Sequence, residues 1–375
     1  MGYEIDYLPV GTKPDHKSGD AIAMRFWDTD PDKSVVITID GGTRDSGAAL
    51  VEHVKKYYKT STVHIAVLTH PDADHSSGLR DILEQMDVAV LLCFIPWEHA
   101  SDVLSIVRNA DSRVTVASIQ NRLRDAFPAT VEAVELAREK KIKIIEPFAN
   151  KSPIDLNEAT RAYLLGPTYD AYLNRWLPHY DCLPTLPTTQ SRLLEILRRK
   201  VERAAKWIAE TWDSELLIDP GDKEVNAENN SSVILALVQG NNRFLFCGDA
   251  GLPSLTDALT FGSTSGLSPS GYTFFHVPHH GSRHNVGPTL LNAFFGEPLP
   301  SPGDHKTGTA FVSATRGDPK HPSRRVTNAL NRRDVKVIAT AGSAKLHHSS
   351  DYVDRGWQRA EPVPFYDQVE DIEDN

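Results

Sequence analysis

Short apolar runs alternate along the chain with stretches in which apolar residues recur three and four positions apart. Apolar runs of about four to eight residues predict strands, whereas the three-and-four spacing predicts helices. The predicted strands are Val35–Asp40, Thr62–Thr69, Val88–Phe94, Lys143–Glu146, Arg161–Leu165, Ser232–Gln239, Arg243–Cys247, Tyr272–Val277, Thr309–Ser313 and Val335–Ala339. The predicted helices are Ser46–Tyr58, Ser77–Met86, Ala129–Lys140, Gln190–Thr211, Thr289–Phe295 and Ser323–Arg332. This alternation predicts an α/β fold.

The composition changes between Tyr169 and Asn226, where aromatic and proline-rich sequence leads into an amphipathic helix predicted over Leu193–Trp212. We interpret this segment as an insertion that packs on the sheet, covers the active site or forms a subunit contact. The insertion contains Trp176, Trp207 and Trp212. We expect these side chains either to pack the insertion against the core or to stack on nucleic-acid bases. The predicted division is one fold in two parts, 1–168 and 227–360, with an insertion at 169–226 and an acidic tail at 361–375.

Composition and charge limit the classes of function. The chain has 375 residues, of which 40% are hydrophobic and 24% charged, so most of it is expected to fold. We find neither a run of about 20 apolar residues nor a signal peptide, so we expect no membrane span and a cytoplasmic location. The net charge of −10 argues against a basic surface that coats long nucleic acid. Part of this charge lies in the tail Glu370–Asp374, which we expect to stay solvated.

The three cysteines are too few and too scattered for a disulfide framework or a thiolate metal cluster. Cys93 and Cys247 lie in apolar runs, and we interpret both, together with Cys182, as buried thiols.

Four potential metal ligands lie within six residues after the second predicted strand. His70, Asp72, Asp74 and His75 crowd into the turn between that strand and the next helix. Imidazole nitrogen and carboxylate oxygen bind borderline and hard divalent cations, and a two-metal site needs about this many such groups from one loop. The alternative is a solvated polar turn in which Asp74 caps the helix.

Further candidates follow later strands. Asp249 comes directly after an apolar strand and a glycine, where a carboxylate can bridge two metals, although Gly-Asp is also a common turn. His279 and His280 follow another strand. Because neighbouring side chains of an extended chain point to opposite sides, we expect only one of the two to bind metal. His321 binds substrate or donates a proton, or belongs to a surface turn; without outside information the turn is favoured.

These runs, in this order, resemble the metallo-β-lactamase superfamily, and in particular the hydrolase domain of ComEC-type DNA-uptake proteins. The resemblance covers most of the chain outside the insertion. It rests on Gly19-Asp20-Ala21-Ile22, Ile39-Asp40-Gly41-Gly42, Thr69 to Leu79, Asn229-Asn230-Ser231-Ser232-Val233, Gly248-Asp249, His279-His280-Gly281-Ser282 and His321-Pro322. It implies an αββα four-layer sandwich with a helical insertion.

The resemblance also implies roles for these residues. His70 and Asp72 would hold one divalent metal ion, Asp74 and His75 a second, and Asp249 would bridge the two; His279 is the preferred last ligand. Many superfamily members place a further histidine before the bridging aspartate, where this chain has Asn229, Asn230 and Ser231. One ion is therefore short of a ligand, and the oxygen-rich site suits manganese as well as zinc. No membrane channel is attached, so DNA uptake itself is not the expected role.

The expected activity is hydrolysis by a metal-bound hydroxide, with Asp74 orienting the water and His321 assisting the leaving oxygen. By analogy with the ComEC-type branch, we expect a phosphodiester in single-stranded nucleic acid or a nucleotide, with a protein partner as a further source of nucleic-acid affinity. Two alternatives remain open: a hydrolase of esters, lactones or thioesters, and a non-catalytic partner-binding protein of the same fold. A non-catalytic member is expected to have lost ligands, and this chain keeps them.

Overall fold

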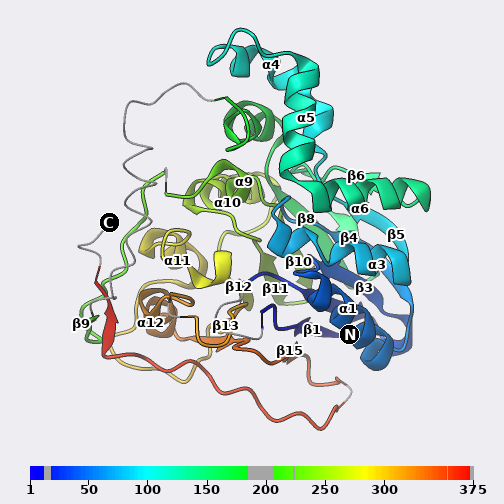
Figure 1. The fold of residues 1–375 in the computed structure, drawn as a ribbon. Helices are drawn as coiled ribbons and strands as arrows, with labels where there is room; N and C mark the ends of the chain where they lie inside the picture. The colour runs from blue at the N-terminus through cyan, green and yellow to red at the C-terminus, as the bar shows by residue number, and fades with distance from the viewer. Residues whose placement is uncertain (12–17, 185–206, 223, 319, 353, 372–375) are drawn as a thin grey trace.

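Two seven-stranded sheets lie face to face in the computed structural model of the chain (Figure 1). The structure describes residues 1–11, 18–184, 207–222, 224–318, 320–352 and 354–371. Aromatic rings from the two sheets meet between them: Tyr3 and Phe26 contact Phe244 with ring centroids 4.7 and 5.5 Å apart, and Tyr7 contacts Phe311 at 5.2 Å. The main apolar core therefore lies between the sheets.

The first sheet has the strand order β15-β1-β2-β3-β4-β5-β6. Strands β3 to β6 are parallel, whereas β1, β2 and β15 run antiparallel to their neighbours. The strands are β1 Gly2–Tyr7, β2 Ile22–Trp27, β3 Val35–Ile39, β4 Thr62–Val67, β5 Asp87–Leu92, β6 Lys143–Ile145 and β15 Lys345–His348.

The second sheet has the order β14-β13-β12-β11-β10-β8-β7 and is parallel from β11 to β14. Its strands are β7 Ile154–Asp155, β8 Thr160–Gly166, β10 Ile234–Gln239, β11 Asn242–Phe246, β12 Phe274–His276, β13 Gly308–Val312 and β14 Val335–Ala339. Each sheet thus presents the carboxyl ends of several parallel strands at one edge, where functional groups commonly gather.

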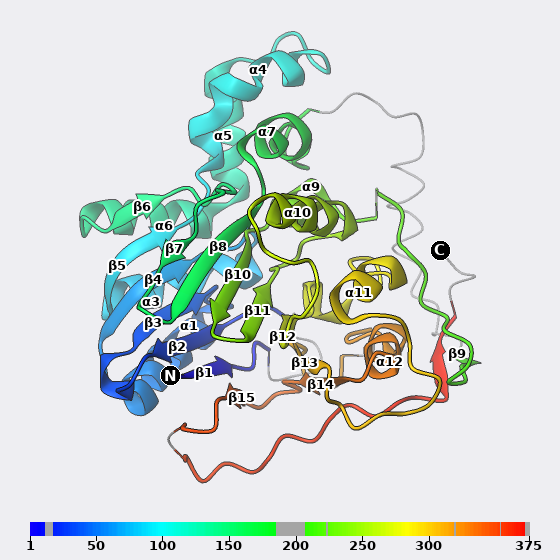
Figure 2. The same cartoon turned by 180° about the vertical axis from the view of Figure 1, so that it is seen from behind.

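Helices cover the outer faces of both sheets. Helices α1 Arg44–His53, α3 Leu79–Gln85 and α6 Pro128–Glu139 lie on the side of the first sheet, and α10 Leu252–Thr264, α11 Pro288–Phe295 and α12 Arg324–Arg332 on the side of the second (Figures 1 and 2). The predicted αββα four-layer sandwich is therefore confirmed. Shorter or peripheral helices are α2 Ala73–Ser76, α4 Ala100–Arg108, α5 Val116–Ala126, α7 Tyr169–Ala171 and α9 Ala227–Asn230. Single turns lie at Pro31–Lys33, Val54–Tyr58, Pro96–His99, Tyr172–Trp176, Leu177–His179 and His279–Gly281.

Two strands that the apolar pattern does not predict, β1 and β2, carry buried charges. Glu4, Asp6 and Arg25 are at most 2% exposed. Arg25 Nε donates to Glu4 Oε2 at 3.0 Å, and Arg355, from the segment after β15, pairs with both Glu4 and Asp6. Charges inside a protein need such partners, because an unpaired buried ion costs several kcal/mol. The pairing allows charged residues to occupy central strand positions.

The prediction of a helix over Gln190–Thr211 is wrong for its last residues. The part of this segment before residue 207 lies outside the described residues. Trp207–Ala209 is strand β9, which pairs antiparallel with β16, Gln368–Glu370. Val369 is fully buried there, and the following Glu210 binds Arg332 at 2.7 Å. This tertiary pairing overrides the local helical pattern.

The expectation of a solvated tail is wrong for Glu370. One of its carboxylate oxygens accepts the backbone N–H of Arg324 at 2.9 Å, and its carbonyl oxygen accepts Arg325 Nε–H at 2.7 Å. Arg324 is the first residue of α12, where N–H groups have no partner within the helix. The carboxylate therefore caps this helix. The last residues, 372–375, lie outside the described part of the chain.

The described part of 169–226 contributes buried side chains. Tyr172, Leu177 and Tyr180 are fully buried, and Trp176 is 7% exposed, so this part packs against the core. Trp207, by contrast, is 42% exposed and stacks with Arg324. Trp212 donates its indole N–H to Leu299 O at 2.7 Å.

Cys93 and Cys247 are buried as predicted, while Cys182 is only partly buried. Within the described ranges, no helix has the length and apolar character that crossing a bilayer requires.

Candidate metal centre

The strand ends of both sheets meet at one place. Asp40 follows β3 and the run beginning at His70 follows β4, while Asp249 follows β11 and His279 follows β12. Gly248 permits the close approach of the sheets: its φ is +50°, and a Cβ there would lie 2.7 Å from Thr69 Cβ. A side chain at this position would push Asp249 away from the β4 loop.

The loop after β4 forms a short helical turn. Asp72 is the N-cap residue of α2, and Asp74 and His75 lie within that helix. His70 and His75 are at most 2% exposed, and their ring centroids are 4.2 Å apart. A solvated turn would expose these rings, so the alternative of a purely structural polar turn does not describe this loop.

Asp249 lies between imidazole rings from both sheets. Its Oδ1 is 3.5 Å from His75 Nε2, and its Oδ2 is 3.9 Å from His70 Nε2 and 3.7 Å from His279 Nε2. These distances are longer than a hydrogen bond. Two ligand atoms about 2.1 Å from one tetrahedral ion lie roughly 3.4 Å apart, so the spacing is that of atoms that share a metal.

Each of the four histidines has its Nδ1 engaged by the protein. His75 Nδ1–H donates to Asp40 Oδ2 at 2.8 Å, and His280 Nδ1–H donates to Ser313 O at 3.0 Å. His70 Nδ1–H donates to Thr69 Oγ1 at 3.0 Å, because the hydroxyl proton is already used on Asp40 Oδ2. His279 Nδ1–H donates to Asn285 Oδ1 at 3.1 Å. Such bonds fix the ring and leave Nε2 as the free ligand atom.

Several of these free atoms are buried without a hydrogen-bond partner: Nε2 of His70, His75 and His280, and Oδ1 of Asp249. Buried polar atoms are rarely left unpaired, because each costs about 1–3 kcal/mol. The sets His70, His75, Asp249 and Asp74, His75, His280 each place one ligand atom per residue within 4.8 Å of one another. The donors present therefore fit a divalent cation.

The electrostatics favour a positive charge at this place. Burial opposes ionisation of Asp249, but His75, His279 and His280 hold its pKa well below the ordinary value. Burial also opposes protonation of His75, yet the carboxylates of Asp249 and Asp40 raise its pKa well above the ordinary value. A bound cation would balance the same carboxylates. Burial lowers the pKa of His280 to about 4, which keeps its Nε2 lone pair free at neutral pH.

The expectation that only one of His279 and His280 binds metal rested on an extended backbone, and the backbone here is not extended. The two residues form a turn with φ of +49° and +58°, followed by Gly281 at +80°. A left-handed turn does not alternate its side chains as a strand does. Both rings therefore face the Asp74–Asp249 region.

His321 lies at the same place, on the rim. Its ring is stacked on that of His279 with centroids 6.2 Å apart, and its Nδ1 is 3.1 Å from Asp318 Oδ2. The side chain is 27% exposed. The structure thus brings together all the candidate residues: His70, Asp72, Asp74, His75, Asp249, His279, His280 and His321.

Beyond Asp40, Thr69 and Ser313, two more supporting residues were not assigned a role from the sequence. Asn285 is fully buried, holds His279, and donates its Nδ2–H to Asp249 O at 2.8 Å. The sequence does not mark it, because its contact with Asp249 joins two loops 36 residues apart in the chain. Asp20, noted only for its resemblance, lies 3.2 Å from His276 Nε2. Burial opposes ionisation of Asp20, but His276, His75 and His280 lower its pKa.

Replacing Asp40 with asparagine should weaken metal binding about 10- to 100-fold. Asp40 accepts from Thr69 N and Oγ1, both at 2.7 Å, and from His75 Nδ1, so one amide oxygen cannot serve all three donors. Asparagine tolerates the φ of +55° at this position, which preserves the backbone. Competition titration of Zn²⁺ against a chelator measures the effect. Asp45→Asn, at an exposed position in the first turn of α1, is the control, and equal affinities for both variants would contradict the prediction.

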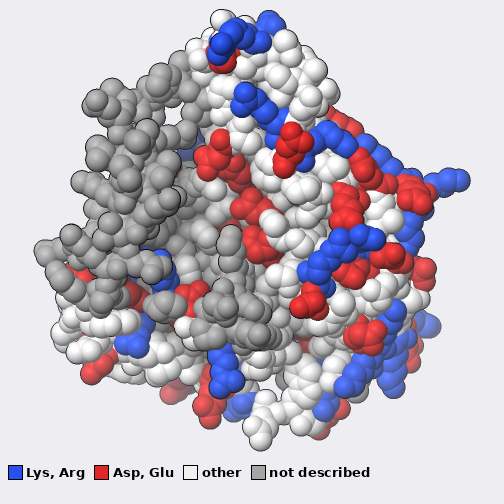
Figure 3. Space-filling model, in the orientation of Figure 1, with Lys and Arg blue, Asp and Glu red and all other residues white. Residues whose placement is uncertain are grey.

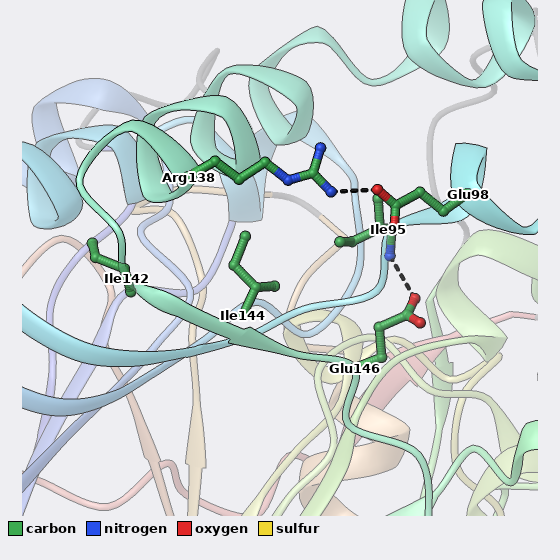
Figure 4. Close-up of a pocket in the computed structure, with 6 residues that line it drawn as sticks. All are labelled: Ile95, Glu98, Arg138, Ile142, Ile144 and Glu146. Atoms are coloured by element: carbon green, nitrogen blue, oxygen red, sulfur yellow. Dashed lines mark hydrogen bonds and ion pairs between the residues drawn. The ribbon is translucent and has the colours of Figure 1, made fainter.

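A separate cavity of about 420 Å³ lies beside the ends of β5 and β6 (Figure 4). Its polar groups are paired with one another: Arg138 with Glu98, and Glu146 with His99 and the N–H of Ile95. The remaining lining residues are Ile142 and Ile144. No candidate metal ligand lines this cavity.

No protein-family model matches the chain, and no curated protein is similar to it. Among solved structures, it is similar to the metallo-β-lactamase fold protein YhfI from Bacillus subtilis, with 8% identity and a TM-score of 0.42 over 93% of this chain and all of that one. It is similar to unliganded yeast PDE1, with 11% identity and a TM-score of 0.42 over 91% and 98% of the two chains. Zn²⁺-bound PqqB from Methylobacterium extorquens has 10% identity and a TM-score of 0.38 over 92% and 99%. Likenesses at this level say nothing about activity or substrate, so the four-layer architecture rests on the layers and strand order of the molecule itself.

Proposed function

We propose that this protein is a metal-dependent hydrolase with two divalent ions, zinc or manganese, acting on a phosphodiester in single-stranded nucleic acid or a nucleotide. The metal-dependent part rests on the anchored imidazoles. The Nε2 atoms of His70, His75 and His279 lie 3.5 to 3.9 Å from the Asp249 carboxylate, and those of His70, His75 and His280 are buried without a hydrogen-bond partner. Mixed imidazole and carboxylate donors suit either metal.

The ligands would be His70, Asp72, Asp74, His75, Asp249 and the His279-His280 pair. When bound, divalent ions lower the pKa of coordinated water and neutralise charge on the attacked group. The chain supplies the rest. Asp40 and Thr69 orient His75 and His70, and Asp74 is the carboxylate expected to accept a hydrogen bond from the attacking water.

His321 is the group proposed to protonate the leaving oxygen. Asp318 engages its Nδ1, so Nε2 is the atom that remains for substrate. The ring is partly exposed and stacked on His279, which places it between solvent and the ligand cluster. A proton donor for a leaving group needs this combination of access and orientation.

The choice of a phosphodiester rests on the motifs that resemble the ComEC-type hydrolase domain, and the charge distribution supports a small or single-stranded substrate. Basic and acidic side chains are interspersed over the described part of the face in Figure 3, with no continuous basic track. The net charge of the chain is −10. Long duplexes require many lysine and arginine contacts to phosphate, whereas a single phosphate can be held by the metals alone.

The test is hydrolysis by metal-free protein resupplied with Mn²⁺ or Zn²⁺, using labelled single-stranded DNA, a generic phosphodiester, and ester and lactone substrates in parallel. The proposal expects metal-dependent cleavage of the phosphodiesters that is lost in Asp74→Ala, while the Asp45→Ala control keeps it. Cleavage of esters or lactones alone would overturn the substrate class. A protein that binds metal and cleaves none of them, or binds no metal, would favour the partner-binding alternative.

A further inference from the structure

The rings of His279 and His280 are oriented differently. Their rings lie 5.6 Å apart and are inclined by 72° to each other. Each ring is held through Nδ1 by a different part of the fold: His279 by Asn285, in the loop before α11, and His280 by Ser313, directly after β13. Two independent anchors for adjacent side chains indicate that both orientations matter, since one ligand would need only one anchor.

His279 shares a carboxylate oxygen with His70. Its Nε2 is 3.7 Å from Asp249 Oδ2, the same atom that lies 3.9 Å from His70 Nε2. His70 Nε2 is in turn 3.8 Å from Asp72 Oδ2. We call His70, Asp72, His279 and Asp249 Oδ2 the His70 half of the centre. It contains two imidazole nitrogens and two carboxylate oxygens.

His280 lies with the other ligands. It belongs to a group with Asp74 and His75, in which one ligand atom of each residue lies within 4.8 Å of the other two. The rings of His75 and His280 are stacked with centroids 5.8 Å apart, and His75 Nε2 is 3.5 Å from Asp249 Oδ1. We call Asp74, His75, His280 and Asp249 Oδ1 the His75 half. It has the same donor composition as the His70 half.

We propose that His279 and His280 serve different metal ions, His279 the ion of the His70 half and His280 the ion of the His75 half. The inference rests on the proposed two-metal function and deepens it. His279 then supplies the ligand that a histidine in place of Asn229, Asn230 or Ser231 was expected to supply. Each ion would then have two nitrogen and two oxygen donors from the protein, and the attacking water would be a fifth ligand.

The test counts bound metal without measuring activity. Wild type and variants are loaded with Zn²⁺ alone, freed of excess by gel filtration, and analysed for zinc per chain; Mn²⁺ loading is the repeat. His279→Asn and His280→Asn are used because asparagine tolerates positive φ, and glycine versions are the second set should either variant fail to fold. We expect two ions in wild type, one in each single variant and none in the double variant. His284→Asn, in the same loop, should keep two.

Double variants assign each histidine to its half. His279→Asn combined with Asp72→Ala should still retain one ion, because both changes affect the same half, whereas His279→Asn combined with Asp74→Ala should retain none. The assignment would be overturned if a single variant bound two ions or none. It would also be overturned if the double variant with Asp72→Ala retained no ion and the one with Asp74→Ala retained one. If wild type binds two ions in this pattern but hydrolyses no substrate, the proposed activity fails and the assignment stands. If wild type binds none, both fail.

Discussion

Asp249→Asn protein is expected to lose hydrolysis by about a thousandfold, roughly 4 kcal/mol of transition-state stabilisation. Both oxygens of Asp249 face imidazole Nε2 atoms, Oδ1 towards His75 and Oδ2 towards His70 and His279. The amide has one oxygen, and its NH₂ group cannot bind a cation. One half of the centre then loses its oxygen ligand from this residue and the other keeps only a neutral amide oxygen, so bound metal should also fall below two ions per chain.

The substitution should leave the fold intact. The other contacts of this residue are made by its backbone: its N–H donates to Ser232 Oγ at 3.1 Å, and its carbonyl oxygen accepts from Asn285. Asparagine keeps both and removes a buried charge. Steady-state rates with the best substrate, together with metal analysis, measure the effect. Asp304→Asn, an exposed carboxylate far along the chain, is the matched control; an Asp249→Asn protein as active as that control would remove Asp249 from the centre.

The sequence predicted the fold well where burial and local pattern agree. Every strand predicted from an apolar run is present, because β-branched runs such as Val35–Ile39 and Thr62–Val67 form interior strands of the first sheet. Strands β1 and β2 were not predicted because Glu4, Asp6 and Arg25 interrupt their apolar runs, although these charged residues are buried in ion pairs. A charged residue in a strand indicates solvent exposure only when no partner of opposite charge is present. The partner of Glu4 could not be found from the local pattern, because Arg355 lies 351 residues away.

The site was predictable as a set of residues but not as an arrangement. Ligand types and their positions after strands are local features, so the clusters at His70, Asp249 and His279 could be found from the sequence. The turn that directs both His279 and His280 towards Asp249 depends on two successive left-handed residues, which an apolar pattern does not encode. Ser313 holds the ring of His280 only because β12 and β13 are neighbours in the sheet, and Asn285, which holds His279 from six residues away, reaches Asp249 because β11 and β12 are neighbours.

Removing the metal is expected to abolish hydrolysis and to lower thermal stability. The free protein keeps unpaired buried atoms on His70, His75, His280 and Asp249, so an ion that binds only the folded state contributes its full binding free energy to folding. At free metal about a thousandfold above Kd this linkage is worth about 4 kcal/mol. For a chain of this length it corresponds to a shift in Tm of roughly 5 °C.

The measurement is a pair of thermal scans with and without chelator, on wild type and on Asp249→Asn. Wild type should melt lower with chelator and recover when Zn²⁺ or Mn²⁺ is restored in excess. The variant should show a much smaller difference, because its centre binds metal weakly at the start. An equal shift in both proteins would mean that the metal stabilises the chain elsewhere, whereas no shift in wild type, with no metal found on analysis, would exclude a metal role for the cluster around Asp249. A ligand stabilises a protein only by binding to its folded state. The comparison of the chelator-induced shift in Tm between wild type and Asp249→Asn therefore separates a metal held by these residues from a general effect of the chelator on the protein.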